Sequence, residues 1–190
     1  MGKLILLTGL PGSGKTTVVE RTLHALADLK SGGFTTREIR DAAGTRLGFE
    51  LRTMDGKTAV LAHVAIQSPF RVGKYGVDIH ALEQVGVAAI REALLAADFV
   101  VIDEIGKMEL LSAEFRETLQ AAIHSPNPIL ATIMLKPHPV ADEIKRSPGA
   151  EVRRVTPQSR DALPGWAAAS IRRALARAGR DQSAAPPPQA

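Results

Sequence analysis

The chain has 190 residues, a formal net charge of +4 and no cysteine. This length fits one domain, and the lack of cysteine excludes both a disulfide framework and a thiolate metal site. No apolar stretch approaches the roughly 20 residues that a membrane span requires, and no signal-peptide pattern opens the sequence, so we expect a cytoplasmic protein without membrane association.

The first element is an apolar run at residues 3–8, which predicts a strand buried on both faces of a parallel sheet. It is followed directly by residues 9–16, which match the Walker A pattern G-x-x-x-x-G-K-[ST]. Apolar residues at helical spacing then predict a helix from about residue 14 to residue 29. A strand, a glycine-rich loop and a helix in this order predict a site for a nucleoside triphosphate.

The residue types in this loop match what a triphosphate requires. Glycines allow successive backbone N–H groups to point at phosphate oxygens, and the positive end of the helix dipole attracts the same anion. Lys15 would reach the β and γ phosphates, and the Thr16 hydroxyl would bind Mg²⁺. The predicted nucleotide-binding residues are Gly9, Leu10, Pro11, Gly12, Ser13, Gly14, Lys15, Thr16 and Thr17.

The next segment alternates at strand spacing. Residues 34–39 and 47–52 flank a turn at 41–44, and together they predict a β-hairpin. A further turn leads to an apolar stretch at 58–64. We therefore expect a three-stranded antiparallel insertion between the phosphate loop and the rest of the sheet.

Residues 68–77 have the composition of a loop, with glycines, a proline and the two cations Arg71 and Lys74. A helix from about residue 80 to residue 97 follows, and it leads into residues 99–102, the strongest strand signal in the chain.

Two acids, Asp103 and Glu104, follow this strand directly. At the carboxyl end of a parallel strand, Asp103 is the expected partner of Thr16 in holding Mg²⁺. Glu104 would accept a proton from water or orient the water for in-line attack. A buried strand that ends in a solvated acidic turn is the alternative, but acids of this kind and a phosphate loop recur together in enzymes that cleave triphosphates.

Several cations are candidates for neutralising charge on the transferred phosphoryl group. Lys107 is the closest to the two acids in sequence, so we place it with Glu104 and Lys15 among the catalytic candidates, although an exposed loop lysine explains it equally well. The further candidates are Arg37, Arg71 and Lys74. Spacing alone does not decide among them.

The last third of the chain predicts further helices and strands. Ser112 can cap a helix that the prolines at positions 126 and 128 end. Residues 129–135 and, more weakly, 151–155 have strand composition, and a last helix is expected at about 164–178.

Beyond this helix, residues 179–190 are rich in alanine and proline and predict a disordered tail. We therefore expect one domain over residues 1–178. Arginine is abundant before the tail, but the chain has only one Trp, one Tyr and five Phe for stacking on bases, so we expect a solvated basic helix face and no nucleic-acid partner. We expect a monomer, and the sequence leaves a weak oligomer open.

These motifs together resemble those of the THEP1-type nucleoside triphosphatases. The resemblance extends to about residue 178, and besides the phosphate loop it is carried by residues 32–39, 47–49, 72–77 and 101–109. It implies an α/β P-loop fold with three layers, α/β/α, and a mainly parallel sheet. It also implies slow Mg²⁺-dependent hydrolysis of several nucleoside triphosphates with little base preference, with Glu104 as the activating carboxylate.

The chain departs from the family's pattern at one place. The family usually has Asn-Arg-Asp near the start of the last helix, where this chain has Ser159-Arg160-Asp161. Any base or ribose contact that the asparagine makes is therefore not carried over. The chain also has no Asn-Lys-x-Asp segment of the kind with which GTPases hold guanine.

Two other functions share some of these features. A small-molecule or nucleotide kinase would use the same phosphate site, with an acceptor near the insertion or the 71–77 loop in place of water. A weakly catalytic nucleotide switch, or an RNA-binding module that uses the basic last third, is the second alternative.

Overall fold

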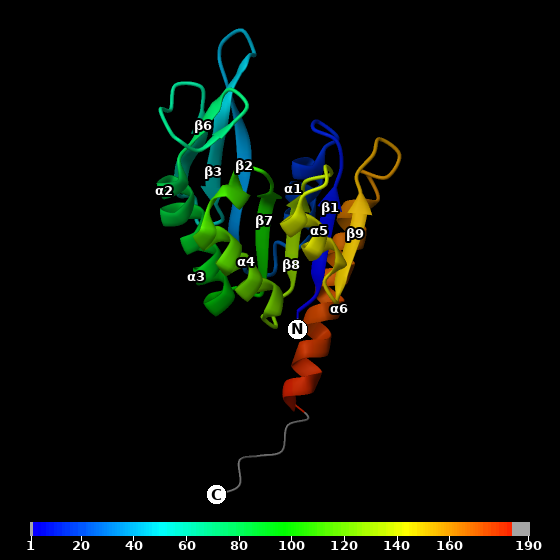
Figure 1. Cartoon of the computed structure of the whole chain (residues 1–190). Helices are drawn as coiled ribbons and strands as arrows, with labels where there is room; N and C mark the ends of the chain where they lie inside the picture. Colours follow the sequence, from blue (N-terminus) through cyan, green and yellow to red (C-terminus); the bar gives the residue numbers. More distant parts are fainter. Residues whose placement is uncertain (1, 184–190) are drawn as a thin grey trace, which may run out of the picture.

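A computed structural model describes residues 2–183 of the chain and shows three layers, with helices on both faces of one sheet (Figure 1). The sheet has nine strands in the order β5-β6-β4-β3-β2-β7-β8-β1-β9 within these residues. The strands are β1 (Leu4–Thr8), β2 (Ser31–Arg40), β3 (Arg46–Thr53), β4 (Thr58–His63), β5 (Arg71–Val72), β6 (Tyr75–Val77), β7 (Phe99–Ile105), β8 (Ile129–Ile133) and β9 (Ala150–Arg154).

The sheet has a parallel part and an antiparallel part that meet at β2. Strands β2, β7, β8, β1 and β9 are parallel neighbours, whereas β3, β4, β6 and β5 continue the sheet with antiparallel pairings. The predicted hairpin and the third antiparallel strand are therefore confirmed. The segment predicted as a loop at 68–77 contains the short hairpin β5–β6, and β2 is at once the first strand of the insertion and a member of the parallel part.

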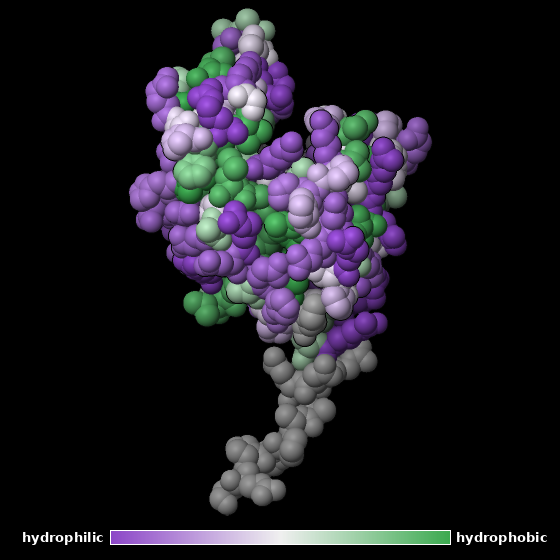
Figure 2. Space-filling model, in the orientation of Figure 1, coloured by the Kyte–Doolittle hydropathy of each residue, from purple (hydrophilic) through white to green (hydrophobic). Residues whose placement is uncertain are grey.

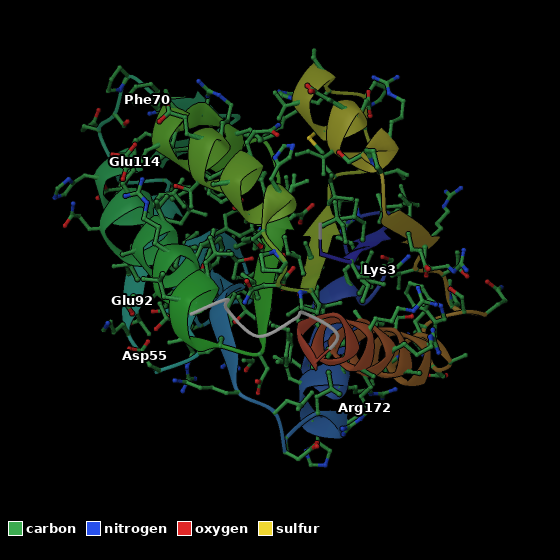
Figure 3. All side chains as sticks on the ribbon, turned by 90° about the horizontal axis from the view of Figure 1, so that it is seen from below. Lys3, Asp55, Phe70, Glu92, Glu114 and Arg172 are labelled. Atoms are coloured by element: carbon green, nitrogen blue, oxygen red, sulfur yellow. The ribbon has the colours of Figure 1, made fainter. Side chains whose placement is uncertain are left out.

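Helices cover the two faces of the sheet in separate groups, which Figure 3 shows end-on. Helices α1 and α6 lie side by side on one face, and α3, α4 and α5 lie on the other. The α-helices are α1 (Lys15–Ala25), α2 (Ile79–Ala81), α3 (Ala88–Ala96), α4 (Ala113–His124), α5 (Pro139–Arg146) and α6 (Leu163–Ser183). None of the helices in residues 2–183 is long and apolar enough to cross a membrane.

The all-apolar β1 strand explains why both faces can be covered. Its side chains alternate, so that Leu4 and Leu6 belong to the core under α3 and α4, while Ile5 and Leu7 belong to the core under α1 and α6. All four side chains are at most 2% exposed. A strand that is buried on both faces is typical of the centre of a parallel sheet.

Several predicted boundaries were wrong. The first helix ends at Ala25, not at residue 29, and the helix predicted at 80–97 begins at Ile79 and contains a π-helical segment at Leu82–Val87. The sequence analysis missed α5, which starts at Pro139. Proline suits the first turn of a helix because its missing N–H has no intrahelical partner there, but a short helix that begins at the second of two closely spaced prolines is easily overlooked.

The C-terminal helix is longer than predicted. It continues to Ser183, so residues 179–183 belong to α6 and not to a disordered tail. The rest of the predicted tail, 184–190, lies outside the described residues.

Candidate active site

The two sequence motifs meet at the carboxyl edge of the parallel strands. The phosphate loop follows β1, the acids lie at the end of β7, and β8 runs between these two strands. Because the three strands are parallel, their carboxyl ends share one edge of the sheet (Figure 1). In Figure 2 this edge is a hollow with hydrophilic walls, between the projecting β2–β3 hairpin and the side formed by β1 and β9.

Three glycines shape the phosphate loop. Gly12 and Gly14 have φ values of 76° and 94°, which residues with a Cβ adopt only with strain. A Cβ at Gly9 would lie 2.6 Å from Ser13 Oγ and 2.8 Å from the carbonyl oxygen of Val155. The loop can therefore close against the end of β9 only with glycine at its first position.

The start of α1 is open to an anion. Gly14 is its N-cap residue and provides no side-chain cap, so N–H groups of the first turn remain available. Leu10 and Pro11 are exposed at the tip of the loop, and Thr17 is exposed on the first turn. Ser13 Oγ is buried and has no hydrogen-bond partner among the described residues, so a phosphate oxygen would satisfy it.

Lys15 connects the loop to the acids. Its Nζ lies 3.4 Å from the carbonyl oxygen of Gly9 and 3.9 Å from Oε2 of Glu104. The Lys15 side chain is 11% exposed and that of Glu104 is 32% exposed. The peptide bond between Asp103 and Glu104 is cis. The folded chain thus places the predicted phosphate-binding lysine next to the predicted activating carboxylate.

Asp103 is buried and incompletely satisfied. Its Oδ1 accepts a hydrogen bond from the Thr132 hydroxyl of β8, while its Oδ2 has no partner among the described residues. Burial raises the pKa of Asp103 to about 6, and the Thr132 hydrogen bond and the nearby Thr16 hydroxyl act in the opposite direction. A buried carboxylate oxygen without a donor beside the Thr16 hydroxyl fits a divalent cation or a water bound to one.

The described part of the chain offers few other side chains that could bind a cation beside Thr16 and Asp103. Residues 2–183 contain no group of three or more His, Asp or Glu side chains that could hold a metal ion. A cation at Thr16 and Asp103 would therefore need phosphate oxygens and water for its other ligands, which is how Mg²⁺ is usually held with nucleotides.

The candidate cations lie at different distances from the loop. Lys107 is exposed in the turn after β7, next to the acids, and Arg37 reaches from β2 to Glu20 of α1 at 3.5 Å. Arg71 donates to the carbonyl oxygen of Lys74 at 3.0 Å, on the β5–β6 hairpin. Strand β6 lies six positions from β1, which at roughly 4.8 Å per strand is about 29 Å. The strand order thus leaves Arg71 and Lys74 far from the loop, whereas Lys107 follows Glu104 by three residues.

Sequence reasoning missed two residues beside the acids. Thr132 lies within an apolar run and gives no signal, because its partner Asp103 comes from another strand. Glu109 is 5% exposed, and its Oε2 accepts a hydrogen bond from the Gly106 N–H at 3.1 Å. Burial raises the pKa of Glu109 to about 8, and the negative charges of Glu104 and Asp103 add to this rise.

Two cavities lie at different distances from the phosphate loop. A cavity of about 170 Å³ adjoins the phosphate loop, and its walls are Gly14, Thr17, Val18, Arg21 and Arg160. A cavity of about 570 Å³ lies at the opposite edge of the sheet, where Lys3 and Arg173 contribute to its wall. Of these two cavities, the smaller one touches the phosphate loop, at Gly14, and the larger one does not.

Comparisons with known proteins identify relatives over most of the chain. The model of a protein family described as NTPase matches residues 4–167. The nucleoside-triphosphatase THEP1 of Thermotoga petrophila is 41% identical over 159 residues, which are 84% of this chain and 87% of the relative. The nucleoside-triphosphatase THEP1 of Methanosarcina acetivorans is 44% identical over 165 residues, 84% of this chain and 91% of the relative.

Two solved structures are also similar. The crystal structure of THEP1 from Aquifex aeolicus matches with a TM-score of 0.76 and 37% identity, covering 85% of this chain and 94% of that one. The solution structure of a human cancer-related nucleoside triphosphatase matches with a TM-score of 0.76 and 31% identity, covering 90% of this chain and 98% of the human one.

Proposed function

This chain belongs to the THEP1 family of nucleoside triphosphatases, and from that premise we propose that it hydrolyses nucleoside triphosphates to the diphosphate and phosphate with Mg²⁺ and with Glu104 as the base that activates water. The observation that carries the proposal is the 3.9 Å separation of Glu104 Oε2 and Lys15 Nζ. A lysine that binds the γ phosphate at this distance leaves the carboxylate beside the phosphorus atom that water attacks.

Each part of the loop has a role in this reaction. Backbone N–H groups of the loop's glycines and of the start of α1 would hold the phosphates in place, and Lys15 would offset the charge of the β and γ phosphates. Glu104 would orient a water in line with the bond to be broken and accept its proton. Lys107 is our candidate for the cation that neutralises charge in the transition state.

Thr16 and Asp103 would hold Mg²⁺, in keeping with the unpartnered Oδ2 of Asp103. When bound, the ion would neutralise negative charge on the β and γ phosphates. The chain's own task is to keep Asp103 oriented, and the Thr132 hydroxyl does this from β8.

Low base selectivity is part of the proposal. The cavity beside the loop offers the long side chains of Arg21 and Arg160 and the Thr17 hydroxyl, with no carboxamide or carboxylate on its wall to read a base edge. Arg21 is engaged with Asp161 at 3.0 Å. Arginine can lie against the face of any base, and this contact does not distinguish one base from another.

We also propose a cytoplasmic monomer that does not bind nucleic acid. Part of the arginine in the last third makes contacts within the chain, since Arg172 binds Asp28 at 2.6 Å and the Arg153 guanidinium lies 5.0 Å from the centre of the Trp166 ring. These contacts leave less free positive charge for a phosphate backbone than the sequence suggests.

The test is steady-state phosphate release with Mg²⁺ and each common nucleoside triphosphate, without any acceptor. Saturable release with similar kcat/KM for ATP, GTP, CTP and UTP, abolished by EDTA and restored by excess Mg²⁺, is the expected result. Phosphate transfer only after an acceptor is added would make the protein a kinase and overturn the proposal. Light scattering during gel filtration tests the monomer.

A further inference from the structure

Glu109 is a buried carboxyl to which the proposed reaction gives no role. It begins the single-turn helix Glu109–Leu111 that follows the acids, and it is 5% exposed. Burying a carboxyl is costly unless donors compensate for the lost water. The donor to the Glu109 carboxyl is a backbone group, the N–H of Gly106, which lies 3.1 Å from Oε2.

Gly106 lies between the two glutamates. A Cβ built on Gly106 would be 2.9 Å from Oε2 of Glu109 and 3.5 Å from Cγ of Glu104. Both backbone polar groups of Gly106 are hydrogen-bonded, because its carbonyl oxygen accepts the Leu110 N–H at 3.1 Å. Because Gly106 follows Glu104 by only two residues, a change in this turn would alter the backbone that carries the Glu104 side chain.

We infer that Glu109 is a positioning residue, whose hydrogen bond to the Gly106 N–H sets the turn after β7 and thereby the direction in which Glu104 faces the bound triphosphate. This inference rests on the proposed role of Glu104. It explains why a carboxyl is buried at a place where an apolar side chain would cost less. An apolar residue would leave the Gly106 N–H without a partner.

The surroundings allow this carboxyl to act without adding charge to the site. Burial first, and then the charges of Glu104 and Asp103, raise the pKa of Glu109 to about 8. At neutral pH the group is therefore mainly protonated, and its oxygen can accept the Gly106 N–H without repelling the triphosphate. Glutamine reproduces this state closely, since its amide is neutral and keeps an oxygen acceptor.

The experiment compares three variants with the wild type. Glu109→Gln keeps an acceptor, Glu109→Ala removes it, and Leu110→Ala opens a cavity in the same helical turn while leaving the backbone hydrogen bonds in place. Glu109→Asp shortens the side chain by one methylene, so that its carboxyl should no longer reach the Gly106 N–H, and it serves in place of the acceptor-deficient Glu109→Ala if that variant does not fold. Each is assayed for kcat and KM with Mg·ATP, and the exchange rate of the Gly106 amide proton is measured by NMR.

We expect loss of the acceptor to lower kcat and to leave KM nearly unchanged. In Glu109→Ala, kcat should fall by about tenfold or more with KM changed by no more than about twofold, because the phosphate loop is untouched and misplacement of a reacting group is costly. Glu109→Gln and Leu110→Ala should keep kcat within about threefold of the wild type. Exchange of the Gly106 amide should be faster in Glu109→Ala and unchanged in Glu109→Gln.

Two outcomes would overturn the inference: wild-type kcat in the acceptor-deficient variant, or an equal loss in Leu110→Ala, which would point to general destabilisation. The proposed function is judged separately, by phosphate release from the wild type. If the wild type releases none, the exchange data decide whether Glu109 sets the turn, and equal exchange in all variants refutes that role.

Discussion

The ammonium group of Lys15 lies 3.9 Å from Oε2 of Glu104, although Lys15 starts the first helix and Glu104 comes near the end of β7, two strands away. Neither side chain is fully exposed, and the pair stands at the edge where the phosphate loop opens. In this position the proposed base and the proposed phosphate-binding cation would act on the same phosphoryl group.

Replacing Glu104 with glutamine should lower turnover by about a hundredfold or more, the scale of a lost general base, with little change in triphosphate binding. The measurements are phosphate release and the affinity for a non-hydrolysable analogue. Glu20→Gln is the matched control, because Glu20 is an exposed glutamate on α1 whose partner is Arg37. Unchanged turnover in Glu104→Gln would remove this residue from the mechanism.

Replacing Lys15 with alanine should weaken both binding and chemistry, because the β and γ phosphates lose a positive charge in direct contact. Calorimetric titration with Mg·ATP and steady-state kinetics measure the two effects. Lys3→Ala removes the same charge at the far edge of the sheet, where Lys3 pairs with Glu151 at 2.6 Å. An affinity for ATP equal to that of the wild type would contradict the assignment of the loop.

Replacing Lys107 with alanine should reduce kcat by about tenfold or more while KM stays near its original value, if this residue is the cation that stabilises the transition state. Arg37→Ala and Lys74→Ala provide the comparison, since Arg37 reaches α1 and Lys74 lies on the distant β5–β6 hairpin. A larger fall in either of these variants would transfer the role to that residue.

Replacing Thr132 with valine should raise the Mg²⁺ concentration for half-maximal activity by about tenfold, since residues that orient a metal ligand typically contribute this much to affinity. Loss of the hydroxyl removes a hydrogen bond that lowers the pKa of Asp103, so the carboxyl is protonated at higher pH and the defect should be larger at pH 6 than at pH 8. Mg²⁺ titrations at the two pH values measure this.

The control for that variant is Thr118→Val, which removes a buried hydroxyl on α4 that has no hydrogen-bond partner among the described residues. It should leave the Mg²⁺ requirement unchanged. Equal Mg²⁺ dependence in Thr132→Val and the wild type would show that the hydroxyl does not support the ion.

Stability should depend on pH through Glu109. Its pKa is about 8 in the folded chain and has an ordinary value of 4.5, so between these values the native state keeps a proton that the unfolded chain has lost. The contribution of Glu109 to the free energy of unfolding therefore falls as pH rises through this window. Relative to Glu109→Gln, the wild type should lose up to about 1.4 kcal/mol per pH unit.

Urea unfolding of both proteins at pH 5, 6, 7 and 8 tests this, because the other ionisable groups are common to both and largely cancel. The difference between the two free energies of unfolding should grow steadily with pH. A difference that does not change with pH would mean that folding does not raise the pKa of Glu109.

The sequence by itself determined the features whose functional residues lie close together in the chain. The phosphate loop needs glycines, Lys15 and Thr16 within one short segment, and the acids stand directly after the apolar residues of the strand that carries them. The alternation of the hairpin was equally local. The ends of the first and last helices and the short helix α5 were harder to predict, because these depend on packing and on a few capping contacts more than on the pattern of apolar residues.

Only the tertiary structure decided which distant groups support the site. Thr132 reaches Asp103 because β8 is inserted between β1 and β7, and strand order cannot be derived from the composition of a strand. The burial of Glu109 depends on how the turn after β7 folds onto the core. Strand order also explains why Arg71 and Lys74 lie far from the phosphate loop. Their side chains are suited to binding phosphate, but their distance from the loop is set by the order in which the strands pair.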